Sequence, residues 1–261
     1  MPGKPRGKLL LVGLGPGDAI HQTPAAADAL SECDVLVGYR GYLEQVSGLL
    51  AGKELVAMEL GQEMERAARA VDLASEGRSV VVVSSGDAGI YGMAGPVFQV
   101  LTDREWDGCT FPVEVVPGIS ALQSAASLLG APLMQDFCAI SLSDLMTPWE
   151  AIERRLQAAA LGDFIAVLYN PRSNRRTWQL PEARRILMER RDGKTPVGLV
   201  RNAYRPSQQV TVTDLDGLES QCEDIDMFTT VVVGNSTTYL HRGLMITPRG
   251  YESWTGATEG V

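Results

Sequence analysis

The sequence predicts an α/β protein built from two three-layered αβα domains in series, the first with a mostly parallel sheet and the second with a mixed sheet. In the first half, short aliphatic runs alternate with segments of helical periodicity, a pattern typical of βαβ units. One of these runs, residues 79–83, is nearly all valine, as expected of a strand buried on both faces of a parallel sheet. Beyond residue 132, strand-like runs follow one another more directly, which indicates an antiparallel component.

The first half begins with a strand that leads into a glycine-rich loop. The next helix has clear start signals, because Thr23 can cap it and Pro24 suits its first turn. Gly38 is expected to end the second strand, and Gly77 to stop the longest helix. The expected strands cover residues 9–12, 34–37, 54–58, 79–83 and 113–116, and the expected helices cover residues 25–30, 42–50, 62–76 and 93–101.

The second half opens with an alanine-rich helix over residues 121–129. Its expected strands, joined partly by helices, cover residues 137–142, 164–168, 196–200, 209–213 and 229–233. The last two look joined without a long helix. We place the domain boundary near residues 117–135, with one domain at 1–120 and the other at 121–261.

Composition and charge narrow the function. The 45% apolar and 21% charged residues are ordinary for a globular protein with a core. Lysine plus arginine number 23 against 32 aspartate plus glutamate, a net charge of −9, and aromatic residues make up 6%. These values argue against nucleic-acid binding, which favours basic surfaces and stacking platforms. The apolar run ending at Gly13 has only about five residues, too few for a signal peptide or a membrane span, so we expect a cytoplasmic protein with no membrane partner.

The four cysteines, Cys33, Cys109, Cys138 and Cys222, lie far apart in the sequence. Their spacing matches neither a zinc site nor the disulfide framework of a small secreted domain. We therefore expect buried, reduced thiols and no metal site.

The loop after the first strand, residues 13–18, reads GLGPGD. In the dinucleotide-binding fingerprint G-x-G-x-x-G, the third glycine would fall on Asp18, whose carboxylate would repel a pyrophosphate. Pro16 also removes a backbone N–H donor that phosphate binding would use. The loop is therefore either a structural turn or a site for a ligand with hydroxyl or ammonium groups.

A second glycine-rich loop, residues 84–92, follows the valine-rich run. It lies where a strand of an α/β sheet ends, the edge at which such sheets bind ligands. Its glycines allow close backbone approach, and Asp87 supplies an acceptor for a hydroxyl or cationic group. Either loop alone could be a simple connection, but two after buried strands favour a shared cleft.

Together with residues 116–121, VPGISA, these loops resemble the signature of the tetrapyrrole methylases, the class III S-adenosylmethionine methyltransferases. The family pattern is similar to residues 11–18 followed by Thr23, then to residues 85–92, then to residues 116–121. The similarity runs from about residue 8 to residue 251. A lone GxGPGD would be a weak signal, whereas three motifs in this order are specific.

Four stretches are similar to the branch of the family that methylates C17 of precorrin-3B: residues 38–43, 84–95, 168–173 and 245–251. That branch also contracts the macrocycle by expelling C20 into an acetyl group. Two departures are Gly41, where a small hydroxyl residue is common in similar sequences, and residues 58–61, where a glycine-methionine-lysine run is more typical.

The resemblance implies S-adenosylmethionine as cofactor, S-adenosylhomocysteine as product, a small tetrapyrrole as substrate, and a homodimer. It places the cofactor in a trough between the domains, with the first domain on the tetrapyrrole side. The implied cofactor contacts are Pro16, Gly86, Asp87, Ala88, Ile90, Tyr91, Ser120, Ala121, Tyr169, Asn170, Ala203, Gly234 and Asn235. The implied substrate contacts are Gly15, Gly17, Tyr39, Arg172 and Arg201.

Ring contraction needs proton transfers, so a general acid or base is expected near the macrocycle. The candidates on the expected rim are Asp18, His21, Asp87 and Tyr91, although a lone histidine is more often structural. Arginine suits the carboxylates of a tetrapyrrole. Arg172 and Arg201 are preferred among arginines that also include Arg175, Arg176, Arg205, Arg242 and Arg249, each of which could instead lie on a solvated face.

Several alternatives stay open. A sister methylase would act at another macrocycle carbon, and a more distant relative would methylate protein or ribosomal RNA. A non-catalytic tetrapyrrole carrier or a nicotinamide-binding oxidoreductase is less consistent with these loops. The sequence leaves open whether the macrocycle is metal-free or carries cobalt.

Overall fold

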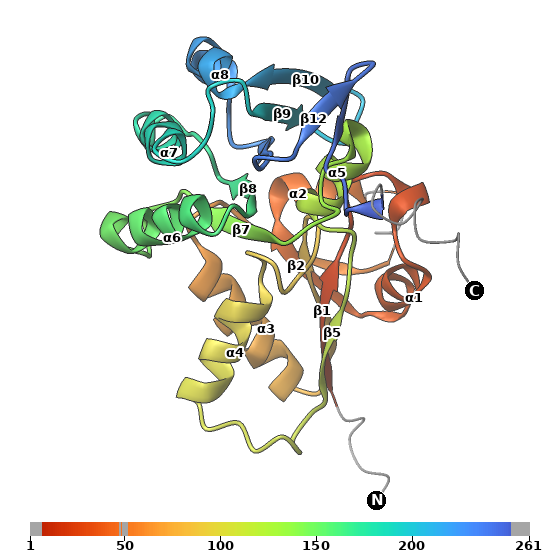
Figure 1. Cartoon of the computed structure of the whole chain (residues 1–261). Helices are drawn as coiled ribbons and strands as arrows, with labels where there is room; N and C mark the ends of the chain where they lie inside the picture. Colours follow the sequence, from red (N-terminus) through yellow and green to blue (C-terminus); the bar gives the residue numbers. More distant parts are fainter. Residues whose placement is uncertain (1–6, 47, 49–51, 252–261) are drawn as a thin grey trace, which may run out of the picture. The chain divides into compact units, whose positions relative to one another are not determined.

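The computed structural model of the chain describes residues 7–46, 48 and 52–251 (Figure 1). The chain divides after Ala121 into two compact units. The first contains a five-stranded parallel sheet, and the second contains a five-stranded mixed sheet and a small three-stranded sheet. The predicted fold class is therefore confirmed in each half.

The parallel sheet of the N-terminal unit has the strand order β3-β2-β4-β1-β5. Its strands are β1 (Lys8–Gly13), β2 (Val35–Tyr39), β3 (Glu54–Met58), β4 (Ser79–Ser84) and β5 (Val113–Val116). The valine run lies in the central strand, and Val80, Val81, Val82 and Val83 are fully buried. A run of this composition fits a position covered on both faces, as its sequence predicted.

Helices cover both faces of this sheet. The helices are α1 (Pro24–Glu32), α2 (Arg40–Gln45), α3 (Glu63–Ser75) and α4 (Ala94–Asp103). Alternate residues of β1 separate the two layers: Leu9 and Leu11 pack in one core with α3 and α4, whereas Leu10 and Val12 pack in another with α1 and α2 (Figure 1). Thr23 caps α1 as predicted, since its Oγ1 accepts a hydrogen bond from the Ala26 N–H at 3.2 Å.

Gly38 does not end the second strand, which corrects the sequence prediction. It lies inside β2, paired in register with Ala57 of β3. A Cβ at this position would lie 2.5 Å from Val83 Cγ2, so glycine permits close packing here and does not make a turn. The helix expected over residues 42–50 is α2, which ends at Gln45; residues 47 and 49–51 lie outside the described residues.

The mixed sheet of the C-terminal unit has the strand order β10-β9-β11-β8-β7. Its strands are β7 (Phe137–Ser141), β8 (Ile165–Tyr169), β9 (Pro196–Arg201), β10 (Gln209–Asp214) and β11 (Thr229–Val233). β7 and β8 are parallel, whereas β10 and β11 both run antiparallel to β9 and flank it. The antiparallel component is thus confirmed, and a short helix, α8 (Leu215–Gln221), joins β10 to β11.

One face of the mixed sheet is covered by α6 (Trp149–Leu161), α7 (Gln179–Met188) and α8, and the other by α5 (Ala121–Leu129) with Met245 (Figure 1). The small sheet consists of β6 (Gly130–Ala131), β12 (Tyr239–His241) and β13 (Leu244–Ile246), none of which the sequence predicted. Among the helices that the structure describes, none has the length and apolarity to cross a membrane.

The cysteine prediction holds only in part. All four thiols are free, but only Cys33 and Cys222 are buried. Burial raises the pKa of both thiols, as it does for the half-buried Cys138. Cys109 is exposed, because it lies in a turn that follows α4, where its N–H bonds to the Asp107 carboxylate.

Candidate functional site

Three loops follow the neighbouring strands β4, β1 and β5 at the carboxyl edge of the parallel sheet. The first two are joined by a reciprocal pair of backbone hydrogen bonds: Gly15 N donates to Gly86 O at 3.0 Å, and Gly86 N donates to Gly15 O at 2.8 Å. The structure thus brings together the two glycine-rich loops that the sequence singled out.

Glycine allows this close approach of the backbones. A Cβ at Gly13 would lie 2.6 Å from the Gly86 carbonyl oxygen, and a Cβ at Gly118 would overlap the same oxygen. Gly86 itself has φ +68°, in the left-handed region that glycine adopts without strain. Where the three loops meet, the carboxyl edge of the sheet is therefore formed mainly by backbone groups.

Asp18 and His21 lie in contact in the first loop. Asp18 caps a one-turn 3₁₀ helix, residues 19–21: its Oδ1 accepts the His21 backbone N–H at 3.1 Å and lies 2.6 Å from His21 Nδ1. Both side chains are about one-third exposed, at 37% and 30%. Two of the four predicted proton-transfer candidates are therefore a hydrogen-bonded pair.

The other two candidates lie in the second loop. The Asp87 carboxylate binds the backbone N–H groups of Gly89 and Gly118, which connects the second loop to the third. Tyr91 has φ +53° and an exposed side chain. Its neighbour Ile90 is also exposed, whereas Ala88 is buried.

Four of the seven described non-glycine residues with positive φ lie at or beside predicted cofactor residues; the other three, Glu105, Asp163 and Arg242, do not. Among the described non-glycine residues with positive φ, Tyr91 (53°) and Asn170 (50°) are predicted contacts, and Asn202 (50°) and Tyr204 (59°) flank the predicted contact Ala203. Such conformations cost of order 1–3 kcal/mol each and cluster at functional sites. Among these residues, Tyr91 is the one that both is a predicted contact and has a bulky side chain in the left-handed region.

In the C-terminal unit, the predicted contacts Tyr169 and Asn170 end β8. The Tyr169 hydroxyl accepts the Leu122 N–H at 2.9 Å and so caps the first turn of α5. Asn170 Nδ2 donates to Ser141 Oγ, at the end of the neighbouring β7, at 3.0 Å. Because these side chains are hydrogen-bonded to α5 and β7, the end of β8 is held in place where a ligand would contact it.

Gly234 and Asn235 follow β11. Asn235 is 3% exposed; its Oδ1 accepts from Thr237 and Thr238, and its Nδ2 donates to Gln135 Oε1 at 2.9 Å. The Gly234 carbonyl accepts from Arg191 Nη1 at 3.0 Å. The Asn235 side chain is therefore part of a buried structural network, and its predicted contact with the cofactor stays a prediction.

The preferred arginines already have partners within the protein. Arg172 donates to the Cys222 carbonyl, and Arg201 Nε lies 2.8 Å from Asp226 Oδ2. Arg176 is only 8% exposed, and burial lowers its pKa. Its donors reach Asn170 O at 2.9 Å, Ser143 Oγ at 3.1 Å and Met227 Sδ at 2.9 Å.

Two polar residues at this edge were not predicted as site residues. Ser84, the last residue of β4, is buried, and its Oγ accepts the Met93 N–H at 3.0 Å, which fixes the end of the second loop. A polar residue directly after a valine run is a usable signal for such a role. Thr23, predicted only as a helix cap, also donates to the Pro117 carbonyl at 3.4 Å in the third loop. The predicted substrate contact Tyr39 packs edge-to-face on Tyr42, with ring centroids 5.1 Å apart.

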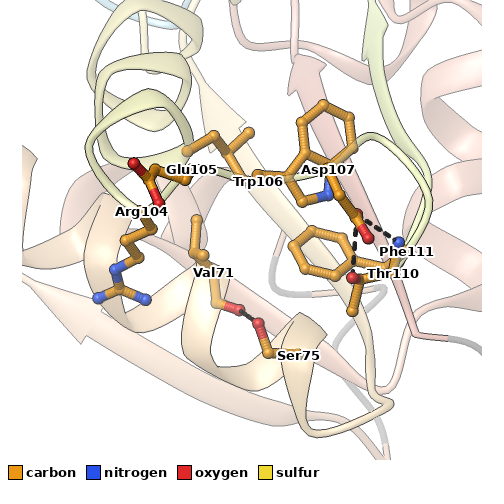
Figure 2. Close-up of a pocket in the computed structure, with 9 residues that line it drawn as sticks. Val71, Ser75, Arg104, Glu105, Trp106, Asp107, Thr110 and Phe111 are labelled. Carbon is orange, nitrogen blue, oxygen red and sulfur yellow. Dashed lines mark hydrogen bonds between the residues drawn. The ribbon is translucent and has the colours of Figure 1, made fainter.

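A cavity of about 250 Å³ lies at the opposite, amino edge of the parallel sheet (Figure 2). It is lined by Val71, Ser75, Leu101, Arg104, Glu105, Trp106, Asp107, Thr110 and Phe111. None of the predicted site residues lines it. Among the described residues, no group of three or more His, Cys, Asp or Glu side chains is arranged to hold a metal ion.

The family model of the Tetrapyrrole (Corrin/Porphyrin) Methylases matches residues 8–219 of the chain. The chain belongs to the tetrapyrrole methylase family. This match confirms the resemblance inferred from the three loop motifs.

Two relatives in the tetrapyrrole methylase family differ in length. A cobalt-factor III methyltransferase of Priestia megaterium is 51% identical over 248 residues, which cover 95% of this chain and 46% of the relative. A probable cobalt-factor III C(17)-methyltransferase of Salmonella typhimurium is 44% identical over 243 residues, which cover 93% of this chain and 99% of the relative. The chain thus spans about half of the first protein and nearly all of the second.

Solved structures of tetrapyrrole methylases share the fold. The methyltransferase CobJ superposes with a TM-score of 0.87 at 38% identity, covering 93% of this chain and 100% of that chain. The uroporphyrin-III C-methyl transferase of Thermus thermophilus, complexed with S-adenyl homocysteine, superposes with a TM-score of 0.68 at 26% identity, covering 87% and 97%.

Proposed function

We propose that the protein is an S-adenosylmethionine-dependent methyltransferase of cobalamin biosynthesis. It methylates C17 of cobalt-factor III or of metal-free precorrin-3B and contracts the ring to the corresponding precorrin-4. The observation that carries this proposal is the near end-to-end match with the probable C(17)-methyltransferase of Salmonella typhimurium. The packed glycine loops at the carboxyl edge of the parallel sheet support it.

The residues of these loops fit S-adenosylmethionine better than a dinucleotide. Pro16 lacks an N–H that phosphate binding would use, and the Asp18 carboxylate would repel a pyrophosphate, so the first loop disfavours a dinucleotide. S-adenosylmethionine, when bound, supplies a methyl group activated by its sulfonium. The contribution of this chain is to position the acceptor carbon and exclude water.

For the proton transfers of ring contraction we propose the Asp18–His21 pair. A carboxylate can only accept a hydrogen bond, so the 2.6 Å contact assigns the imidazole proton to Nδ1. In the neutral imidazole this tautomer leaves the lone pair on His21 Nε2, the atom that we propose accepts a proton from the substrate. A base whose tautomer is fixed by a carboxylate is a recurrent catalytic arrangement.

We further propose that Arg172 and Arg201 bind carboxylates of the macrocycle. Each would exchange its present partner, the Cys222 carbonyl or Asp226, for a substrate oxygen. Gly15, Gly17 and Tyr39 complete the proposed substrate contacts. A homodimer and a cytoplasmic location also belong to the proposal.

The first test is thermal unfolding with S-adenosylhomocysteine, with NADH as the control. A ligand that binds only the folded state stabilises it, so saturating S-adenosylhomocysteine should raise the Tm by several degrees and NADH should not. No shift with S-adenosylhomocysteine would contradict the cofactor assignment and favour a tetrapyrrole carrier.

The second test is turnover with each macrocycle. A sister methylase adds the same mass, so fragmentation and absorbance of the product, which detect ring contraction, distinguish it from the proposed enzyme. Comparing cobalt-factor III with precorrin-3B then assigns the metal state of the substrate.

A further inference from the structure

Both carboxylate oxygens of Asp87 bind backbone N–H groups. Oδ1 accepts from Gly89 in its own loop at 2.8 Å, and Oδ2 accepts from Gly118 in the third loop at 3.0 Å. Each of these bonds has an ionised acceptor, which makes it roughly twice as strong as a neutral hydrogen bond. The second bond spans 31 positions of the sequence and joins loops that follow different strands.

This bond completes a three-loop arrangement. The first and second loops are held by the reciprocal backbone pair of Gly15 and Gly86. The third loop reaches the second because Gly118 has no Cβ to strike the Gly86 carbonyl. The Asp87 side chain then fixes the third loop in place, two residues before Ser120.

We infer that Asp87 is a positioning residue, which holds the third loop with its cofactor residues Ser120 and Ala121 against the second loop, and is not a proton-transfer group. The inference rests on the proposed function, because it takes these loops to bind S-adenosylmethionine. Proton uptake by Asp87 would remove the negative charge that strengthens both of these hydrogen bonds, so transfer at this position would weaken the contacts that hold the loops together.

Asp107 provides a matched control in the same unit. Its Oδ1 accepts the backbone N–H groups of Cys109 and Thr110, each at 2.8 Å, beside the cavity at the amino edge (Figure 2). Asp107→Asn therefore removes a loop-capping charge at the amino edge of the parallel sheet, the edge opposite the proposed site. Asp87→Asn removes the corresponding charge at the carboxyl edge and sets an amide N–H₂ against one of its two N–H donors.

The experiment measures the Kd of S-adenosylhomocysteine and of S-adenosylmethionine by calorimetry for the unsubstituted protein and both variants, with kcat at saturating cofactor. For Asp87→Asn we expect both Kd values to rise by the same factor, about tenfold or more, with kcat largely retained; a tenfold change corresponds to about 1.4 kcal/mol. Asp107→Asn should leave both Kd values unchanged. If circular dichroism shows Asp87→Asn to be unfolded, Asp87→Ser, which keeps one acceptor, is measured in its place.

Three results would overturn the inference alone. Unchanged Kd values with kcat lost would make Asp87 a proton-transfer group. A raised Kd for S-adenosylmethionine only, whose sulfonium is charged, would make it an electrostatic contact. If Asp87→Asn had the same Kd values and the same kcat as the unsubstituted protein, the positions of the loops would not depend on Asp87. Failure of the unsubstituted protein to bind S-adenosylhomocysteine would instead overturn the proposed function.

Discussion

The carboxylates of Asp18 and Asp87 lie at the same edge of one sheet but accept hydrogen bonds of different kinds. Asp18 Oδ1 contacts an imidazole nitrogen and one backbone N–H, whereas the described bonds of Asp87 are all to backbone N–H groups. A carboxylate bonded to an imidazole sets its tautomer and orientation. At the scale of the residue, proton transfer is therefore expected at the first loop.

Asp18→Asn tests this assignment. The amide can present its N–H₂ to His21 Nδ1 and so favour the other tautomer, while the backbone of the loop stays in place. We expect kcat to fall by about 10²–10⁴-fold, with the Kd of S-adenosylhomocysteine unchanged. Asp28→Asn, on the exposed side of α1, is the control and should match the unsubstituted protein. Unchanged turnover in Asp18→Asn would remove Asp18 from the mechanism.

At the scale of the element, close packing in the N-terminal unit requires a glycine in β2. A Cβ at Gly38 would meet Val83 Cγ2 at 2.5 Å. Gly38→Ala should therefore destabilise the protein by about 1–3 kcal/mol through overpacking. Denaturant unfolding measures this loss; a neutral Gly38→Ala would show that Val83 moves aside easily.

The cap of α8 predicts a dependence on pH. Asp214 accepts the Gly217 N–H at 2.7 Å, and this bond, with Lys194, lowers the pKa of the carboxyl below its ordinary value of 3.8. The folded pKa lies below the unfolded one. The ionised cap therefore stabilises the fold fully at pH values above the unfolded pKa, and this stabilisation is lost as pH falls through the folded pKa. Asp214→Ala should cost about 1 kcal/mol at pH 7, and the difference from the unsubstituted protein should shrink below about pH 4. A difference that persists in strong acid would contradict the role of the charge.

At the scale of the whole molecule, the sequence predicted those elements whose position depends on neighbouring residues in the chain. Thr23 with Pro24 marked the start of α1, and the valine run marked the centre of the parallel sheet. The short strands β6 and β13 escaped prediction because they have two or three residues and pair across more than a hundred positions, as Gly130 does with Met245. Such lengths carry no periodic pattern.

In the candidate site, too, local features were predictable and contacts between distant residues were not. The motifs identified the loops because glycine permits backbone conformations that other residues avoid and proline fixes φ, both of which are local effects. The partners of the charged side chains could not be predicted: Arg172 finds the Cys222 carbonyl 50 positions away, and Asp87 finds Gly118 31 positions away. These contacts arise from the order of strands in the sheets, which no spacing in the sequence encodes.

The strand order of the parallel sheet has a consequence for biosynthesis. β5 is the last strand of this sheet to be translated, yet it pairs with the first, β1, and its following loop supplies the Gly118 N–H that Asp87 binds. A ribosome-bound chain that ends before Gly118 therefore lacks one of the three loops. The proposed cofactor contacts continue to Asn235, so competence to bind the proposed cofactor requires the C-terminal unit as well, and an abortive N-terminal fragment would not withdraw S-adenosylmethionine from the cell.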